Sequence, residues 1–273
     1  MKLLLLSTIC FVITNISLAI KPIKEYLSYP DTSLINFEEF KIISKTNNDT
    51  IVTWKYSPKK SNENSSKTII LSYGDYGNMS YFINQATILT QLGFNVITYD
   101  YRGFGSSSYL NIDETNLYYE EFVDDLKLVI KYYSSIKPNS FVLYGLSMGS
   151  YISLRAAIDL KINNEINISH IVLEGALLNP AKISKGLIKL GKRSTLPLNN
   201  QKIHFKNLKK YKVLVFKGKN DELINSQLNP FKLFFSGWKI KTYKGGHLQA
   251  LQKLTKNYFG DIYFSKIIEF INS

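Results

Sequence analysis

The chain has 273 residues, of which 45% are hydrophobic and 14% aromatic, and 34 basic against 21 acidic residues give a formal net charge of +13. This length and apolar content suit one large or two small folded domains and exclude a disordered or fibrous chain. The excess charge is almost all lysine, since only Arg102, Arg155 and Arg193 are arginines. Proteins that recognise bases and phosphates favour arginine over lysine. We therefore expect no nucleic-acid partner and only a weak attraction to anionic surfaces such as a membrane.

The N-terminal residues have the order of an export signal. A charged start is followed by an apolar stretch from Leu3 to Ile13 and by the small-x-small motif Ser17-Leu18-Ala19. We predict a signal peptide at residues 1–19 and a secreted or extracytoplasmic protein, the alternative being an uncleaved membrane anchor in residues 3–20. The single cysteine, Cys10, lies in this leader, so no intramolecular disulfide and no cysteine metal site can form.

Past the leader, short apolar runs predict the strands of a mostly parallel sheet. The segments Phe37 to Ser44 and Ile51 to Tyr56 predict a pair of strands joined by a polar turn. Six further runs of strand character follow, at 68–73, 94–99, 140–144, 168–174, 212–216 and 238–243. Helical spacing follows most of them, as in Glu120 to Tyr133, and a helix is expected at Ser226 to Phe235. This alternation is typical of an α/β protein with helices on both faces of its sheet.

Residues 178–210 interrupt the alternation. They hold two prolines, many lysines and a weak apolar stripe. If Ala181 to Leu190 is helical, Ile183, Leu187 and Leu190 lie on one face and lysines line another. We therefore predict a small insertion between two strands of the sheet.

The segment Gly145-Leu146-Ser147-Met148-Gly149 matches the G-x-S-x-G pattern of a serine nucleophile. A strand run precedes it and a helical stretch follows, which is the context that the chemistry requires. On such a sharp turn the serine hydroxyl is exposed at a helix N-terminus, and the glycines let the turn pass close to its neighbours. Ser147 is therefore the predicted nucleophile, against the alternative of a glycine-rich turn that happens to hold a serine.

A nucleophilic serine needs a base, and the chain has three histidines. His170 begins an apolar strand run, which favours a structural role, and His204 lies in the insertion without a turn signal. His247 follows two glycines directly after the last strand, where a loop can carry the imidazole toward another loop at the same sheet edge. We predict His247 as the general base.

The base needs an acid that fixes its tautomer. Asp221 follows the strand at 212–216, and sites on open parallel sheets form at the carboxyl ends of strands. Two alternatives stay open: Asp221 as a helix cap, and Glu174, at the end of the preceding strand, as the acid. We predict Asp221, which gives the chain order Ser147, Asp221, His247.

This order and two further motifs resemble the α/β-hydrolase fold proteins, in the branch of Bem-type hydrolases, monoacylglycerol lipases and acyl-protein thioesterases. Residues 69–78 resemble the oxyanion strand and loop of that branch. Residues 93–106 are similar to its next strand and D-x-R-G-x-G turn, and the resemblance covers about residues 37–272. It implies a single α/β-hydrolase domain at 20–273, a mostly parallel sheet with helices on both faces, and a lid at about 178–210.

The resemblance also implies an oxyanion hole made by the backbone N–H groups of Asp75 and Met148. One residue departs from the family pattern: Tyr73 precedes Gly74 where the family has histidine. The donor is a backbone group, so the departure bears on how the loop is held more than on the type of reaction.

Other charged residues lie near these motifs. We expect Asp100 and Arg102, in the D-x-R-G turn, to brace loops near the site. Asp124 and Asp125 fall on the next helix, and we expect them on a solvated or capping face.

The predicted function is that of an exported serine hydrolase that cleaves a carboxylic ester or thioester through an acyl-enzyme on Ser147. No metal and no organic cofactor is expected, because the constellation supplies nucleophile, base and oxyanion donors itself. The expected partner is a small-molecule or lipid ester. The alternative is a catalytically silent binding or scaffold protein with the same fold.

Overall fold

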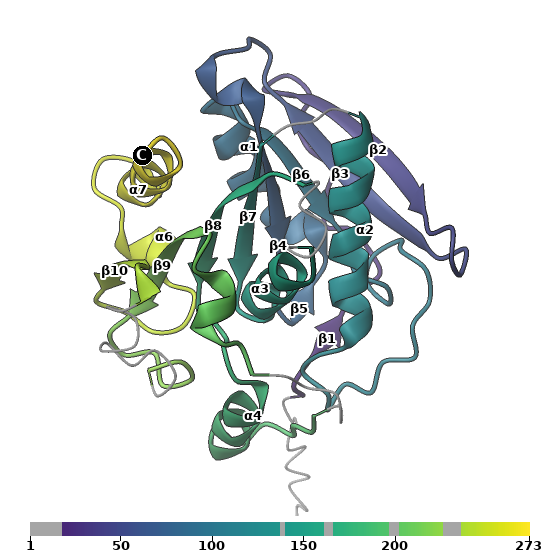
Figure 1. Cartoon of the computed structure of the whole chain (residues 1–273), viewed down its shortest axis with the longest axis vertical. Helices are drawn as coiled ribbons and strands as arrows, with labels where there is room; N and C mark the ends of the chain where they lie inside the picture. The colour runs from purple at the N-terminus through teal and green to yellow at the C-terminus, as the bar shows by residue number, and fades with distance from the viewer. Residues whose placement is uncertain (1–17, 137–139, 161–165, 197–201, 226–235) are drawn as a thin grey trace, which may run out of the picture.

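The computed structural model describes residues 18–136, 140–160, 166–196, 202–225 and 236–273 (Figure 1). Within them one eight-stranded sheet has the order β10-β9-β8-β7-β4-β6-β3-β2. Its strands are, in chain order, β2 (Asn36–Ile43), β3 (Thr50–Ser57), β4 (Lys67–Ser72), β6 (Asn95–Tyr99), β7 (Ser140–Leu146), β8 (Ile168–Glu174), β9 (Lys212–Gly218) and β10 (Lys239–Tyr243). β2 and β3 form an antiparallel pair, β3 pairs antiparallel with β6, and all pairs from β6 to β10 are parallel.

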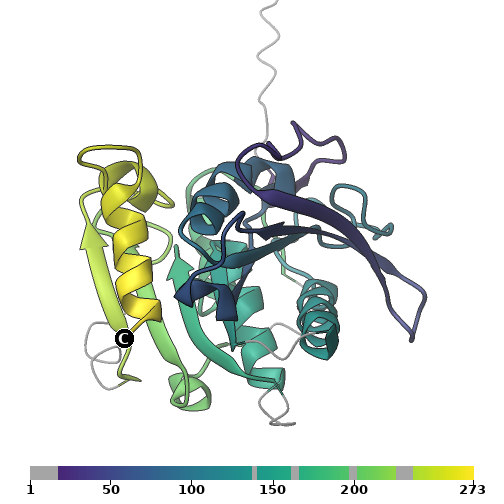
Figure 2. The ribbon, with the colours of Figure 1, turned by 90° about the horizontal axis from the view of Figure 1, so that it is seen from above.

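The central parallel strands are nearly continuous apolar runs because both of their faces are covered. Helices α1 (Ile83–Gln91) and α7 (Asp261–Ile271) lie on one face, and α2 (Glu120–Ile136) and α3 (Met148–Leu160) lie on the other (Figure 2). The predicted α/β-hydrolase architecture is thereby confirmed. The helix expected at Ser226 to Phe235 falls outside the described residues.

The insertion after β8 contains helix α4 (Pro180–Lys189), which begins at the cap residue Asn179. Ile183 and Leu187 are buried, as its apolar stripe predicts. Leu190, which was predicted on the same face, is the C-cap of the helix and is 52% exposed, so the buried part of the stripe stops at Leu187. The reason is that the helix stops there, and the 3.6-residue period no longer applies.

The segment that precedes β2 pairs with the loop that follows β4. β1 (Lys21–Pro22) pairs in parallel with β5 (Tyr76–Gly77), and both lie at the same end of the molecule as α4 in Figure 1. Ala19 is fully buried, and its N–H donates to the carbonyl of Glu114 over 3.0 Å. A bridge also pairs Leu18 with Arg193 of the insertion.

Three short 3-10 helices complete the described elements, η1 (Glu63–Ser66), η2 (Met79–Phe82) and η4 (Phe205–Leu208), together with the short helix α6 (Ala250–Lys253). Among the described helices, none combines the length and the apolar character that crossing a bilayer requires.

Candidate active site

Ser147 occupies the sharp turn between β7 and α3. Its backbone has φ 50°, in the left-handed region that is strained for a residue with a side chain. The flanking glycines are required by close packing: a Cβ at Gly145 would lie 2.6 Å from the Cα of Ser150, and a Cβ at Gly149 would overlap the carbonyl of Ser72. The turn is anchored by the Ser147 N–H, which donates to the carbonyl of Glu174 over 2.9 Å. The hydroxyl is thereby held at the start of α3.

The structure brings the three residues of the predicted triad together. His247 Nε2 lies 2.9 Å from Ser147 Oγ, and His247 Nδ1 lies 2.8 Å from Asp221 Oδ2. The Asp221 side chain is fully buried, whereas the His247 side chain is 23% exposed. The other carboxylate oxygen of Asp221 accepts from the N–H groups of Leu223 and Ile224. Asp221 therefore both holds the turn that follows it and contacts the histidine, whereas the helix that it was considered to cap falls outside the described residues.

The loop of His247 is held in place by contacts within the loop and with β9. Gln249 accepts from the Gly246 N–H over 2.8 Å, and the Tyr243 hydroxyl donates to the Gly246 carbonyl over 2.9 Å. A Cβ at Gly218 would lie 2.5 Å from the same carbonyl, so the loop passes directly over the end of β9. This close approach places the imidazole beside the loop that carries Asp221.

Glu174, the alternative acid, forms its hydrogen bonds with residues other than His247. Its carboxylate accepts from the Ala250 N–H and from the Tyr263 hydroxyl, each over 2.8 Å. Burial raises the pKa of Glu174, while those two hydrogen bonds and the nearby His247 act in the opposite direction. Glu174 thus ties the segment after His247 to β8, and the geometry favours Asp221 as the orienting acid.

The other two histidines lie elsewhere. His170 is buried in β8, with Nδ1 3.0 Å from Ser169 Oγ and its ring edge-on to Phe270. Burial, reinforced by nearby lysines, lowers the pKa of His170 to about 4. His204 is exposed and precedes the short helix η4. Neither contacts Ser147 within the described residues.

The predicted oxyanion loop runs past the nucleophile. A Cβ at Gly74 would lie 3.5 Å from the Cβ of Ser147, so the peptide that ends in the Asp75 N–H borders the serine. Met148, the other predicted donor, is the first residue of α3, where backbone N–H groups have no helical partner. Two backbone donors therefore flank Ser147, an arrangement that can stabilise an anionic oxygen.

Tyr73 and Asp100 brace this loop from behind. The Tyr73 hydroxyl donates to Asp100 Oδ1 over 3.1 Å, and the Tyr73 ring stacks on Phe82. The tyrosine therefore stands where the family pattern has histidine and holds the loop through a buried carboxylate. Burial raises the pKa of Asp100 to about 6, against the effect of the hydrogen bonds that it accepts.

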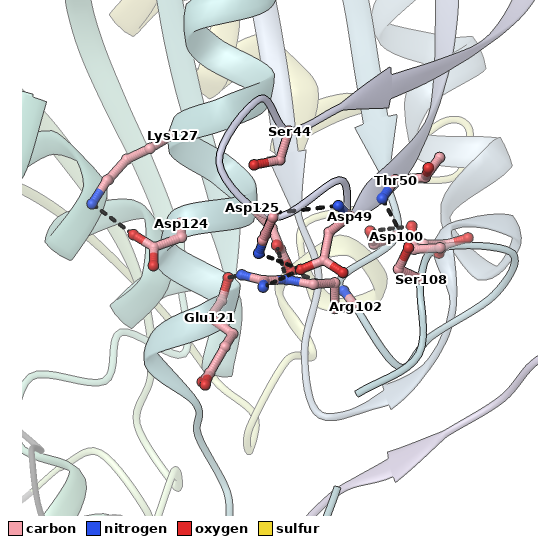
Figure 3. A network of polar contacts seen from close by, with 12 residues as sticks. Ser44, Asp49, Thr50, Asp100, Arg102, Ser108, Glu121, Asp124, Asp125 and Lys127 are labelled. Carbon is pink, nitrogen blue, oxygen red and sulfur yellow. Dashed lines mark hydrogen bonds and ion pairs between the residues drawn. The ribbon is translucent and has the colours of Figure 1, made fainter. Parts of the chain in front are cut away.

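Arg102, from the same D-x-R-G turn, forms a separate polar network (Figure 3). Its Nε lies 2.6 Å from Asp125 Oδ1, and its Nη1 lies 2.7 Å from Asp49 Oδ2. Asp125 is 2% exposed, so its expected place on a solvated or capping face was wrong, whereas Asp124 is exposed and pairs with Lys127. The missed signal was its helical spacing, three residues after the buried Phe122.

Among the described residues, no group of three or more histidine, cysteine, aspartate or glutamate side chains is arranged to hold a metal ion. The chemistry that the site can perform with its own groups is nucleophilic attack by Ser147 with proton transfer to His247.

Comparison with known families identifies the family of the chain. The sequence profile of the Hydrolase_4 family, described as serine aminopeptidase, S33, matches residues 63–234, more than half of the chain. The chain belongs to this α/β-hydrolase family. The match contains Ser147 and Asp221, and His247 follows it.

The curated relatives that the chain matches are distant. The chain is 25% identical over 218 residues to the uncharacterized protein YfhR of Escherichia coli K12, covering 77% of this chain and 72% of that protein. It is 29% identical over 177 residues to the uncharacterized membrane protein YNL320W of Saccharomyces cerevisiae, covering 63% and 57%. A further match, at 29% over 135 residues, covers 46% of this chain and 44% of YfhR of Salmonella typhimurium. The chain thus spans about half the length of the yeast and Salmonella proteins.

Solved structures share the fold. The Pyrococcus furiosus esterase Pf2001 superposes with a TM-score of 0.71 at 16% identity, over 93% of this chain and 96% of the esterase. A thermostable carboxyl esterase of Bacillus coagulans gives a TM-score of 0.61 at 16% identity, over 86% and 98%. At these identities the likeness shows the α/β-hydrolase fold.

Proposed function

We propose that this member of the Hydrolase_4 family is a serine hydrolase that cleaves a carboxylic ester or thioester. The observation that carries the proposal is the continuous chain of hydrogen bonds from Ser147 through His247 to the buried Asp221. A structural serine has no need of a strained backbone, a histidine at hydrogen-bond distance and a carboxylate behind that histidine. The finer assignment, to the branch of Bem-type hydrolases, monoacylglycerol lipases and acyl-protein thioesterases, is part of this proposal.

In the proposed reaction Ser147 Oγ attacks the carbonyl carbon while its proton passes to His247 Nε2. Asp221 holds the Nδ1–H side of the ring and stabilises the imidazolium that forms. The N–H groups of Asp75 and Met148 donate to the oxyanion of the tetrahedral intermediate. His247 then protonates the leaving alcohol or thiol, and a water molecule, deprotonated by His247, releases the acid from Ser147.

A hollow lined by both apolar and polar side chains, beside the chain neighbours of Ser147 and His247, supports an ester with an apolar group. It has a volume of about 380 Å³, and its lining includes Leu146 and Leu248, the chain neighbours of Ser147 and His247. Phe82 and Phe259 also line it. Apolar walls with a few polar groups are typical of small-molecule sites. We infer a small-molecule or lipid ester as the substrate.

Covalent labelling tests the proposal directly. A fluorophosphonate probe should label the protein, and Ser147→Ala should abolish labelling and lower esterase turnover by several orders of magnitude. Ser153→Ala is the matched control, because Ser153 lies buried on the same helix and its hydroxyl has no hydrogen-bond partner among the described residues. A folded wild-type protein that neither reacts with the probe nor hydrolyses esters would favour the binding or scaffold alternative.

A substrate panel defines the bond that is cleaved. p-Nitrophenyl esters from acetate to palmitate should be hydrolysed, with Ser147→Ala as the blank. An aminoacyl p-nitroanilide belongs in the panel because the family description is that of a serine aminopeptidase. Hydrolysis of the anilide without any hydrolysis of the esters would contradict an ester substrate.

We also propose export of the protein through residues 1–19, and a weak contact of its insertion with anionic surfaces. Ile188 and Leu190 are exposed beside the lysines of α4, which supports the surface contact.

The two proposals have separate tests. For export, mass spectrometry of extracytoplasmic material should find a chain that begins at Ile20, whereas intact Met1 would favour the anchor. Sedimentation with anionic vesicles should decrease with added salt.

A further inference from the structure

The segment of residues 20–27, which we name the N-terminal strap, is bonded along the length of the oxyanion loop (residues 73–79). The Lys21 N–H donates to the Asp75 carbonyl over 2.7 Å, and the Ile23 N–H donates to the Gly77 carbonyl over 3.1 Å. In return, the Asn78 amide donates to the carbonyl of Ile23 over 3.1 Å. The strap and the loop therefore form one small parallel sheet, apart from the main sheet.

A single buried carboxylate joins the strap to both ends of this loop. Asp100 Oδ2 accepts from the Tyr26 hydroxyl over 2.7 Å. Asp100 Oδ1 accepts from the Tyr73 hydroxyl over 3.1 Å and from the Met79 N–H over 2.8 Å. Asp100 has no exposed surface, so all three donors serve to satisfy a carboxylate taken out of water. Tyr26 is the one of these donors that comes from the strap.

These contacts bear on the proposed oxyanion donor. The Asp75 N–H belongs to the peptide group between Gly74 and Asp75. Gly74 has no side chain that could fix this peptide. The following peptide group, which contains the Asp75 carbonyl, accepts a hydrogen bond from the Lys21 N–H of the strap. The direction of that N–H thus depends on its neighbours on both sides: Tyr73 bonded to Asp100, and the Asp75 carbonyl bonded to the strap. Oxyanion donors stabilise a transition state only when they are aimed before the reaction begins.

We infer that the N-terminal strap sets the geometry of the oxyanion hole, with Tyr26 and Asp100 as positioning residues for the hydrolysis. The inference rests on the proposed function, since it concerns the rate of that reaction. It gives residues 20–27 a role in turnover although they lie far along the chain from Ser147. It also accounts for Tyr73, which reaches the carboxylate that the strap uses.

Tyr26→Phe tests the inference, because it removes only the hydroxyl, which donates to Asp100 over 2.7 Å and accepts from the Ser106 N–H over 3.2 Å. Tyr29→Phe is the matched control: Tyr29 lies on the adjoining segment and is 60% exposed, its ring packs on Tyr26 and Trp54, and its hydroxyl has no hydrogen-bond partner among the described residues. Active sites are titrated with a fluorophosphonate first, so that each rate refers to folded enzyme. We expect kcat for p-nitrophenyl acetate to fall about tenfold in Tyr26→Phe with KM little changed, and no such loss in Tyr29→Phe.

The affinity for a transition-state analogue distinguishes a positioning role from a merely structural one, because a loss of stability alone would leave this affinity per titrated site unchanged. A trifluoromethyl ketone forms a tetrahedral adduct whose oxyanion occupies the hole, so its affinity should weaken by the same factor as kcat. Asp100→Asn should produce the same paired losses, since it replaces the shared acceptor, and it serves if Tyr26→Phe does not fold.

Two results would overturn the inference: a kcat in Tyr26→Phe equal to that of Tyr29→Phe, or a lowered kcat with unchanged affinity for the ketone. If Asp100→Asn has to serve, an unchanged kcat per titrated site overturns it equally. A wild-type protein without labelling or ester hydrolysis would instead overturn the proposed function, so the two failures are distinct.

Discussion

Gly175, which follows β8, should be needed for catalysis although it carries no reactive group. Its φ of +63° lies in the left-handed region, and a Cβ built there would lie 2.5 Å from His247 Cε1. Gly191 has a φ of +79°, but a Cβ there would meet nothing within 4 Å. Alanine at either position therefore has the same backbone strain, and only alanine at 175 collides with the imidazole.

The two costs can be separated by size. A residue with a side chain in the left-handed region costs about 1–2 kcal/mol, which both variants share. In a protein of this length, that corresponds to a melting temperature lower by roughly 2–8 °C. Relief of the contact at 175 moves the ring by about 1 Å, and a misplacement of that size costs roughly 100-fold in rate. Gly175→Ala should thus lose about 100-fold in kcat, and Gly191→Ala should lose little.

The assay is ester hydrolysis by both variants at equal concentrations of titrated active sites. Melting temperatures measured in parallel show whether the two proteins share the same backbone cost. A kcat of Gly175→Ala close to that of Gly191→Ala would show that the imidazole can move without loss. The close packing of β8 on the histidine would then have no part in catalysis.

Two further predictions concern buried charged and titratable groups. Asp221→Asn should lower kcat by about 10³–10⁴-fold, because it disturbs the tautomer of His247, whereas Glu174→Gln keeps an acceptor for Ala250 and should lose less than about tenfold. The opposite ranking in the same esterase assay would assign the acid to Glu174. His170 should make stability depend on pH, since its pKa falls from 6.5 to about 4 on burial. Between these values only the unfolded chain holds the proton, so the free energy of unfolding should fall as pH drops from 6.5 to 4, by at most about 1.4 kcal/mol per pH unit. Denaturant titrations should show this loss to be smaller in His170→Leu, and equal slopes would refute it.

The sequence by itself determined the fold and the residues of the candidate site. Strand runs, helical periods and the G-x-S-x-G pattern are local signals, because each arises from neighbours within about one element. The chain order of Ser147, Asp221 and His247 added a constraint on topology. Parallel strands then bring their carboxyl ends to one edge of the sheet, which made the meeting of these side chains predictable.

Only the tertiary structure decided which buried carboxylate has which partner. Asp221 and Glu174 both follow parallel strands, and the sequence alone left both open as the acid. The path of the loop after β10 places His247 on Asp221 and the Ala250 N–H on Glu174. That path depends on the packing of glycines against the backbone, as at Gly218. Such packing produces no periodic pattern in the sequence from which it could be predicted.

The strap and the oxyanion loop show the same limit. Tyr26 and Asp100 are 74 positions apart, and Ser147 and His247 are 100 apart. The second pair was found because both members belong to a recognisable motif. Tyr26 belongs to no motif, and its hydroxyl has a hydrogen-bond partner only because the fold buries Asp100 beside it. Contacts between distant segments are selected by the packing of the whole domain, so the tertiary structure alone shows that the strap borders the site.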